Sequence, residues 1–105
     1  MDEKELYELL KSLNIPVAYD HFVLSEATKV EPPFILYRNM DSAQFKADDQ
    51  VYFKTKQYQV ELVTDYKDID LEIMLEELFA GNHIPWDKTE VYIDAEKIYQ
   101  ITYSI

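Results

Sequence analysis

The sequence predicts an α+β fold in which a mixed, mainly antiparallel sheet of four to five strands carries two helices on one face, in the order α-β-β-β-α-β-β. Three observations lead to this prediction. Two segments repeat apolar residues at helical spacing, several short segments alternate apolar and polar residues, and Pro or Gly marks the boundaries. At 105 residues the chain has the size of one domain, so residues 1–105 are expected to share one core.

The first segment, residues 3–13, has the pattern of an amphipathic surface helix. Its apolar face is a repeat of leucine, at Leu6, Leu9, Leu10 and Leu13. These positions have the i, i+3, i+4, i+7 spacing of one helical face. Asp2 is placed to cap the N-terminus of this helix. Asn14-Ile15-Pro16 ends it, because Pro disfavours the α conformation in the residue before it.

Extended segments follow on both sides of a proline-containing loop. Residues 17–23 are expected to be extended, and residues 25–33, which are polar and end in two prolines, to form the loop. Residues 34–39 and 58–64 have strand patterns and should pair as an antiparallel hairpin. The intervening residues 40–56 are long for a hairpin connection, where about two to five residues are usual. They are expected to form an extended arm or to add a short strand near its root.

A second helix is predicted to run from a capping Asp68 through Ala80. Its apolar residues fall on one side and its glutamates on the other. The apolar set is Leu71, Met74, Leu75, Leu78 and Phe79, and the acidic set is Glu72, Glu76 and Glu77. Gly81, the only glycine of the protein, stands where a left-handed residue is wanted after the last helical turn.

The chain closes with a predicted hairpin. Residues 90–94 and 97–105 are joined through Asp94-Ala95-Glu96, a spacing typical of a β-hairpin. Alternate residues of the last strand are apolar, namely Tyr99, Ile101, Tyr103 and Ile105, while Gln100, Thr102 and Ser104 face the other way. The last strand is expected to fill the gap between residues 58–64 and residues 90–94.

Composition and charge exclude several classes of protein. Hydrophobic residues make up 48% of the chain, too many for a disordered protein. The net charge is −11, and residues 68–96 hold nine acidic residues against one lysine, a local net charge of −8. Such a charge keeps a protein soluble, repels DNA phosphates and anionic membranes, and favours a basic protein partner. Without cysteine, without a basic, apolar leader and without an apolar run of membrane-spanning length, a cytoplasmic protein is expected.

No catalytic, metal or cofactor site is expected. His21 and His83 are far apart, neither has a second histidine at helical spacing, and the chain has no cysteine, whereas zinc sites need three or four ligands. The adjacent pairs Asp48-Asp49 and Glu76-Glu77 point apart on a strand or around a helix. A chain with one glycine cannot build a glycine-rich phosphate loop. Enzyme activity is therefore not expected, and direct nucleic-acid binding is not expected from a chain with one arginine, Arg38.

Four segments carry a resemblance to a known family. They are PPFILYRN, ADDQVYFK, QYQVELVTDYKD and, near the end, EKIYQITY. Their order around the acidic LEIMLEEL helix resembles that of the small tail-completion or tail-terminator proteins of long-tailed bacteriophages and prophages of Gram-positive hosts. The likeness covers nearly the whole chain. Ile69 departs from the family pattern, in which many relatives have Pro near the start of the second helix.

The resemblance implies a non-enzymatic virion protein at the head-proximal end of the tail. Such proteins assemble as a ring on the last layer of tail-tube subunits, stop tube growth and receive the connector of the filled head. The implied partners are other copies of the chain, the tail-tube protein and the head-tail connector protein, first in the host cytoplasm and then in the neck of the virion. By position, Phe45, Tyr52 and Phe53 are expected to contact a neighbouring subunit, and Glu72 and Glu76 a basic partner.

Two other functions fit the same sequence. A head-tail connector subunit acts at the same place in the virion, and the order of elements separates it poorly from a tail terminator. An acidic inhibitor or DNA mimic from a mobile element would also be small, strongly negative and free of cysteine. Such a mimic needs carboxylates spaced along one surface, whereas much of the acidic charge here is predicted on one flank of a helix and in turns.

Overall fold

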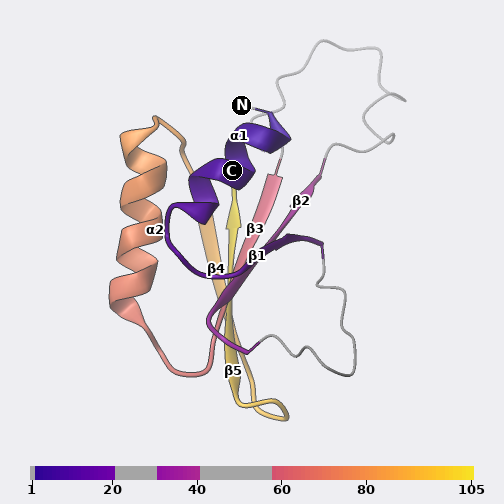
Figure 1. The fold of residues 1–105 in the computed structure, drawn as a ribbon. Helices are drawn as coiled ribbons and strands as arrows, with labels where there is room; N and C mark the ends of the chain where they lie inside the picture. The colour runs from indigo at the N-terminus through magenta and orange to yellow at the C-terminus, as the bar shows by residue number, and fades with distance from the viewer. Residues whose placement is uncertain (1, 21–30, 41–57) are drawn as a thin grey trace, which may run out of the picture.

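The computed structural model describes residues 2–20, 31–40 and 58–105 as two helices and five strands (Figure 1). In chain order these are α1 (Glu3–Lys11), β1 (Val17–Tyr19), β2 (Phe34–Asn39), β3 (Tyr58–Thr64), α2 (Ile69–Gly81), β4 (Asp87–Ile93) and β5 (Ile98–Ser104). The α+β class and the order α-β-β-β-α-β-β are those predicted.

The five strands form one mixed sheet in the order β1-β2-β3-β5-β4. β1 runs parallel to β2, and the other three pairs of neighbours are antiparallel. The predicted pairing of residues 34–39 with residues 58–64 is confirmed, with Ile35 opposite Leu62. The prediction for the last strand is also confirmed, because β5 lies between β3 and β4. Among the described strands, β1 and β4 are thus the two edges of the sheet.

One core joins the helices to alternate positions of the sheet. The fully buried sheet residues include Ile35, Val60, Leu62, Ile101 and Tyr103, and the strand registers place them on a single face. The same cluster contains Leu6 and Leu10 from α1 together with Leu75 and Phe79 from α2. This arrangement is the one expected if both helices cover that face. The opposite face carries Phe34, Leu36 and Arg38 of β2 with Gln59, Glu61 and Val63 of β3.

Both helices begin at the predicted aspartates. The Asp2 carboxylate accepts a hydrogen bond of 2.8 Å from the backbone N–H of Glu5. The Asp68 carboxylate accepts one of 3.1 Å from the N–H of Leu71. These are the N-cap contacts expected of aspartate. α1 ends at Lys11, two residues earlier than predicted, and the chain turns at Asn14, whose φ is 61°.

The end of α2 differs from the prediction for Gly81. Gly81 is the last helical residue and does not have a positive φ; the left-handed residue is His83, with φ of 58°. The N–H of Ile84 donates to the Phe79 carbonyl at 2.9 Å, and the N–H of His83 to the Ala80 carbonyl at 3.1 Å. This pair of bonds is a Schellman motif, in which His83 takes the left-handed position. The prediction was wrong by two residues because the helix extends through the glycine.

The predicted sides of α2 are wrong at two positions. Met74, predicted on the apolar side, is 51% exposed, and Glu72, predicted on the acidic flank, is only 3% exposed. The strand after α2 also begins three residues earlier than predicted, at Asp87. This extension brings Lys88 of β4 into the sheet, opposite Tyr103 of β5. Glu72 can be buried because its carboxylate pairs with Lys88.

Candidate functional site

An ionic cluster lies between α2 and the β4 edge of the sheet. We define it as Lys67, Glu72, Glu76, Lys88, Glu90 and Tyr103. Glu72 and Glu76 are one helical turn apart on α2. Lys88 and Glu90 belong to alternate positions of β4, opposite the core residues Tyr103 and Ile101 of β5. Residues of α2 and residues of β4 therefore meet on the core face of the sheet.

Two lysines hold the buried carboxylate of Glu72 between them. Lys88 Nζ lies 2.7 Å from Glu72 Oε1 and 2.7 Å from Glu76 Oε2. Lys67 Nζ lies 2.7 Å from Glu72 Oε2, and it also pairs with Glu90. Tyr103, fully buried, donates a hydrogen bond of 2.7 Å from its hydroxyl to Glu76 Oε2.

The electrostatics of the cluster fix its protonation at neutral pH. Burial alone would raise the pKa of Glu72, but the hydrogen bonds and charges of Lys67 and Lys88 outweigh it and hold the pKa below its ordinary value. Burial would likewise lower the pKa of Lys88, and its two glutamate partners raise it. Burial and the bond to Glu76 raise the pKa of Tyr103 far above its ordinary value. All three shifts move the titration of these groups further from pH 7.

The two acidic residues predicted to contact a basic partner belong to the ionic cluster. Glu72 and Glu76 are brought together by the structure, but both carboxylates are already paired within the chain. Their contact with a basic partner protein stays a prediction. The three aromatic residues predicted to contact a neighbour, Phe45, Tyr52 and Phe53, lie outside the described residues.

Three residues of α2, together with Tyr66 just before the helix, are exposed apolar side chains that the sequence analysis did not predict as a surface. Tyr66, Ile69, Ile73 and Met74 are 60%, 58%, 45% and 51% exposed. The signal was present, because Ile69 and Ile73 have the i, i+4 spacing of a second apolar stripe. We call these four residues the outer α2 stripe. Single exposed apolar residues are common on protein surfaces, but neighbouring ones mark candidate contact sites.

The free edge of β4 is a second candidate contact surface. Six of its seven residues are exposed, among them Val91 at 57% and Tyr92 at 46%. Within the part of the chain that the structure describes, β4 pairs with β5 alone. An edge strand presents unpaired N–H and C=O groups along its length, which can accept a strand from another chain.

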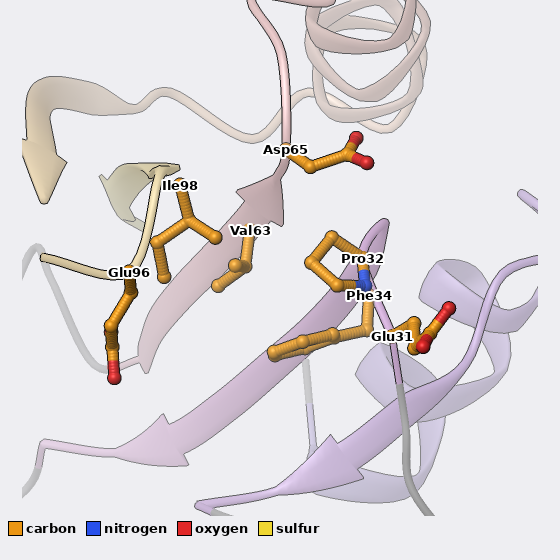
Figure 2. A pocket seen from close by; sticks show the side chains of 7 residues that line it. All are labelled: Glu31, Pro32, Phe34, Val63, Asp65, Glu96 and Ile98. Carbon is orange, nitrogen blue, oxygen red and sulfur yellow. The ribbon is translucent and has the colours of Figure 1, made fainter. Parts of the chain in front are cut away.

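A pocket of about 650 Å³ lies at the end of the sheet where β2 begins and β3 ends (Figure 2). Figure 2 shows the side chains of Phe34, Val63 and Ile98 converging from three neighbouring strands, with Pro32 beside them. The side chains of Glu31, Asp65 and Glu96 also line the pocket, with Glu96 on one side of the apolar groups and Asp65 and Glu31 on the other, and their carboxylate ends point outward. Its lining comes from the face of the sheet opposite the main core.

Residues 2–20, 31–40 and 58–105 contain no group of three or more His, Asp or Glu side chains that could hold a metal ion. In the same residues, neither helix has the length and apolar character needed to cross a membrane. Comparison with family models, with curated proteins and with solved structures finds no match for this chain.

Proposed function

We propose that this chain is a structural protein of a long-tailed bacteriophage or prophage, which completes the head-proximal end of the tail tube as a ring and allows the head to join. The proposal starts from the resemblance of the PPFILYRN, QYQVELVTDYKD and EKIYQITY segments to tail-completion proteins. In the fold these segments contribute β2, β3 and β5, the three central strands of the sheet.

The observation that carries the assembly part of the proposal is the open sheet with two unlike edges. β1 is a three-residue edge, parallel to its neighbour, and β4 is a seven-residue edge, antiparallel to its neighbour. A contact that joins unlike surfaces of identical subunits is head-to-tail, and it closes into a ring when the rotation between subunits allows. The outer α2 stripe supplies further apolar area for contact with a subunit or with the tail tube.

The ionic cluster weighs against the acidic-inhibitor alternative. A DNA mimic must present its carboxylates to the basic groove of a target protein. Here Glu72 is 3% exposed and shares Lys88 with Glu76, so two central carboxylates of the acidic segment are neutralised inside the chain. The connector alternative makes the same structural demands as the tail-completion role, and only the stage of assembly that fails separates the two.

The test is electron microscopy of a lysate from the parent phage or prophage with this gene deleted. We expect filled heads beside unattached tails, some of them overlong, and recovery of whole virions when the gene is supplied from a plasmid. Normal tails beside heads that leak DNA would assign the chain to the connector instead. Fully normal virions would exclude a structural role and leave the inhibitor as the alternative.

A further inference from the structure

The pocket of Figure 2 has the composition of a receptor for a long cationic side chain. Its centre is apolar, formed by Pro32, Phe34, Val63 and Ile98, and its rim carries Glu31, Asp65 and Glu96. The volume of about 650 Å³ falls in the range of roughly 300–1,000 Å³ found for ligand pockets, which combine an apolar lining with a few polar groups.

The carboxylates of the rim have no ion-pair partner in the described part of the chain. Among the described residues, no lysine or arginine lies within ion-pair distance of Glu31, Asp65 or Glu96. Elsewhere the fold does pair its acids. On the same face of the sheet, Arg38 lies 3.6 Å from Glu61, and on the opposite face two lysines flank Glu72. Within residues 2–20, 31–40 and 58–105, the rim is therefore an anionic site without a neutralising cation.

Three separate segments build this rim. Glu31 precedes β2, Asp65 follows β3, and Glu96 lies in the turn between β4 and β5. A guanidinium group presents five N–H donors in a planar fork, and it can bond to carboxylates on more than one side, whereas an ammonium group is a compact point charge. The methylene groups of an arginine side chain can at the same time cover an apolar floor.

We infer that this pocket receives an arginine side chain of a partner protein. The aliphatic part of that arginine packs on Val63 and Ile98, and its guanidinium bonds to the carboxylates of the rim. Because the rim is acidic, charge complementarity predicts that the partner surface is basic, which agrees with the net charge of −11 of this chain. This arginine contact is independent of the tail-completion role.

The test is a titration of the ¹⁵N-labelled full chain with the peptide acetyl-Gly-Arg-Gly-amide, followed by amide chemical shifts. We expect shifts to concentrate at residues 31–35, 63–66 and 96–99. The matched control replaces arginine by citrulline, which has the same shape without the charge. Citrulline shifts equal to those of the arginine peptide would overturn the inference, and so would arginine shifts that spread evenly over the acidic residues of α2.

A pair of charge-matched variants locates the effect. Asp65→Asn with Glu96→Gln removes two carboxylates of the rim, and we expect roughly fivefold weaker binding of the arginine peptide. Asp70→Asn with Glu77→Gln changes the net charge equally on exposed positions of α2, and we expect binding unchanged. All four side chains are exposed, so neither variant disturbs the core.

Equal binding by the two double variants would overturn the pocket as the site. Spermidine separates a protein side chain from a small polyamine, since both are cations with methylene groups. We expect spermidine at the same concentration to shift the pocket signals less than the arginine peptide does. Equal or larger shifts with spermidine would overturn the assignment to an arginine of a partner protein.

Discussion

At the scale of single residues, the burial of Glu72 is the feature that most needs a physical cause. An unpaired buried carboxylate would cost several kcal/mol or lose its charge. Glu72 keeps its charge because Lys88 Nζ and Lys67 Nζ each lie 2.7 Å from one of its oxygens. Both lysine side chains are 35% exposed, so their own ammonium groups retain much of their hydration. Glu72 is thus a carboxylate held at the boundary of the core by two partly exposed lysines.

Lys88→Met should destabilise the protein, because it leaves Glu72 and Glu76 without the lysine that they share. The methionine keeps the aliphatic packing of the lysine stem. We expect the free energy of unfolding to fall by about 1–3 kcal/mol, less than for a fully buried pair because Lys88 is partly exposed. Urea unfolding measures this. Lys97→Met is the control, since Lys97 is 73% exposed, and it should change stability by less than about 0.5 kcal/mol. Equal effects would show that the cluster contributes little.

The same carboxylates predict a loss of stability in acid. The lysines hold the pKa of Glu72 and of Glu76 below the ordinary value of 4.5. A carboxyl group whose pKa is lower in the folded state binds its proton more weakly there, so it stabilises the fold above its unfolded pKa and ceases to do so as pH falls through its folded pKa. We therefore expect the free energy of unfolding to decline as pH falls below 4.5. In Glu72→Gln that decline should be shallower than in the natural chain. Equal slopes in urea titrations across this range would contradict the argument.

At the scale of elements, the end of α2 shows how local signals compete. The helix continues through Gly81 because the Schellman bonds are made by the two residues after Asn82. A Cβ added at Gly81 would meet no atom within 4 Å. Gly81→Ala should therefore stabilise the protein by about 0.5–1 kcal/mol, by restricting the unfolded chain and raising helix propensity. A thermal unfolding experiment decides this, and a loss of stability would restore Gly81 as the left-handed residue.

His83→Gly is the companion change at the same helix end. His83 has φ of 58°, which costs a residue with a side chain roughly 1 kcal/mol relative to glycine. We expect a gain below that value, because glycine also increases the entropy of the unfolded chain. The expected signs of the two substitutions are opposite to those that a left-handed Gly81 would give, in which case alanine at 81 would be strained. Together, the two stability measurements decide whether Gly81 or His83 is the left-handed residue.

Elements with a strong local pattern could be predicted from the sequence, and features made by distant partners could not. The caps Asp2 and Asp68 act within three residues, so their patterns are visible along the chain. Placement of β5 between β3 and β4 followed from the order of elements and the alternation at the end of the chain. The burial of Glu72 depends on Lys88, sixteen positions later, which the strand register brings against α2. The pocket likewise joins three segments that no local pattern connects.

At the scale of the whole molecule, the sheet of the described residues ends at β4, and this edge strand is a candidate surface for assembly. A folded monomer with a seven-residue exposed edge strand has to keep that edge from pairing with the wrong chain. β4 carries Asp87, Lys88 and Glu90, charges that natural edge strands use against nonspecific pairing. Val91 and Tyr92 at the other end of the strand interrupt this protection and stay exposed. Specific pairing is therefore expected at the apolar end of β4.

Val91→Lys should separate folding from assembly. Val91 is 57% exposed in the isolated chain, so the substitution should alter the free energy of unfolding by less than about 0.5 kcal/mol. In a subunit contact the lysine would be buried against a neighbouring strand, and an interface loss of about 1.4 kcal/mol weakens each contact roughly tenfold. Supplied from a plasmid to the deleted phage, this variant should fail to restore whole virions. Glu77→Gln changes the charge by the same amount on α2 and should restore them.

If Val91→Lys restores virions as well as the natural chain does, the β4 edge is not a subunit contact. The ring would then have to be built through the outer α2 stripe or the aromatic residues Phe45, Tyr52 and Phe53.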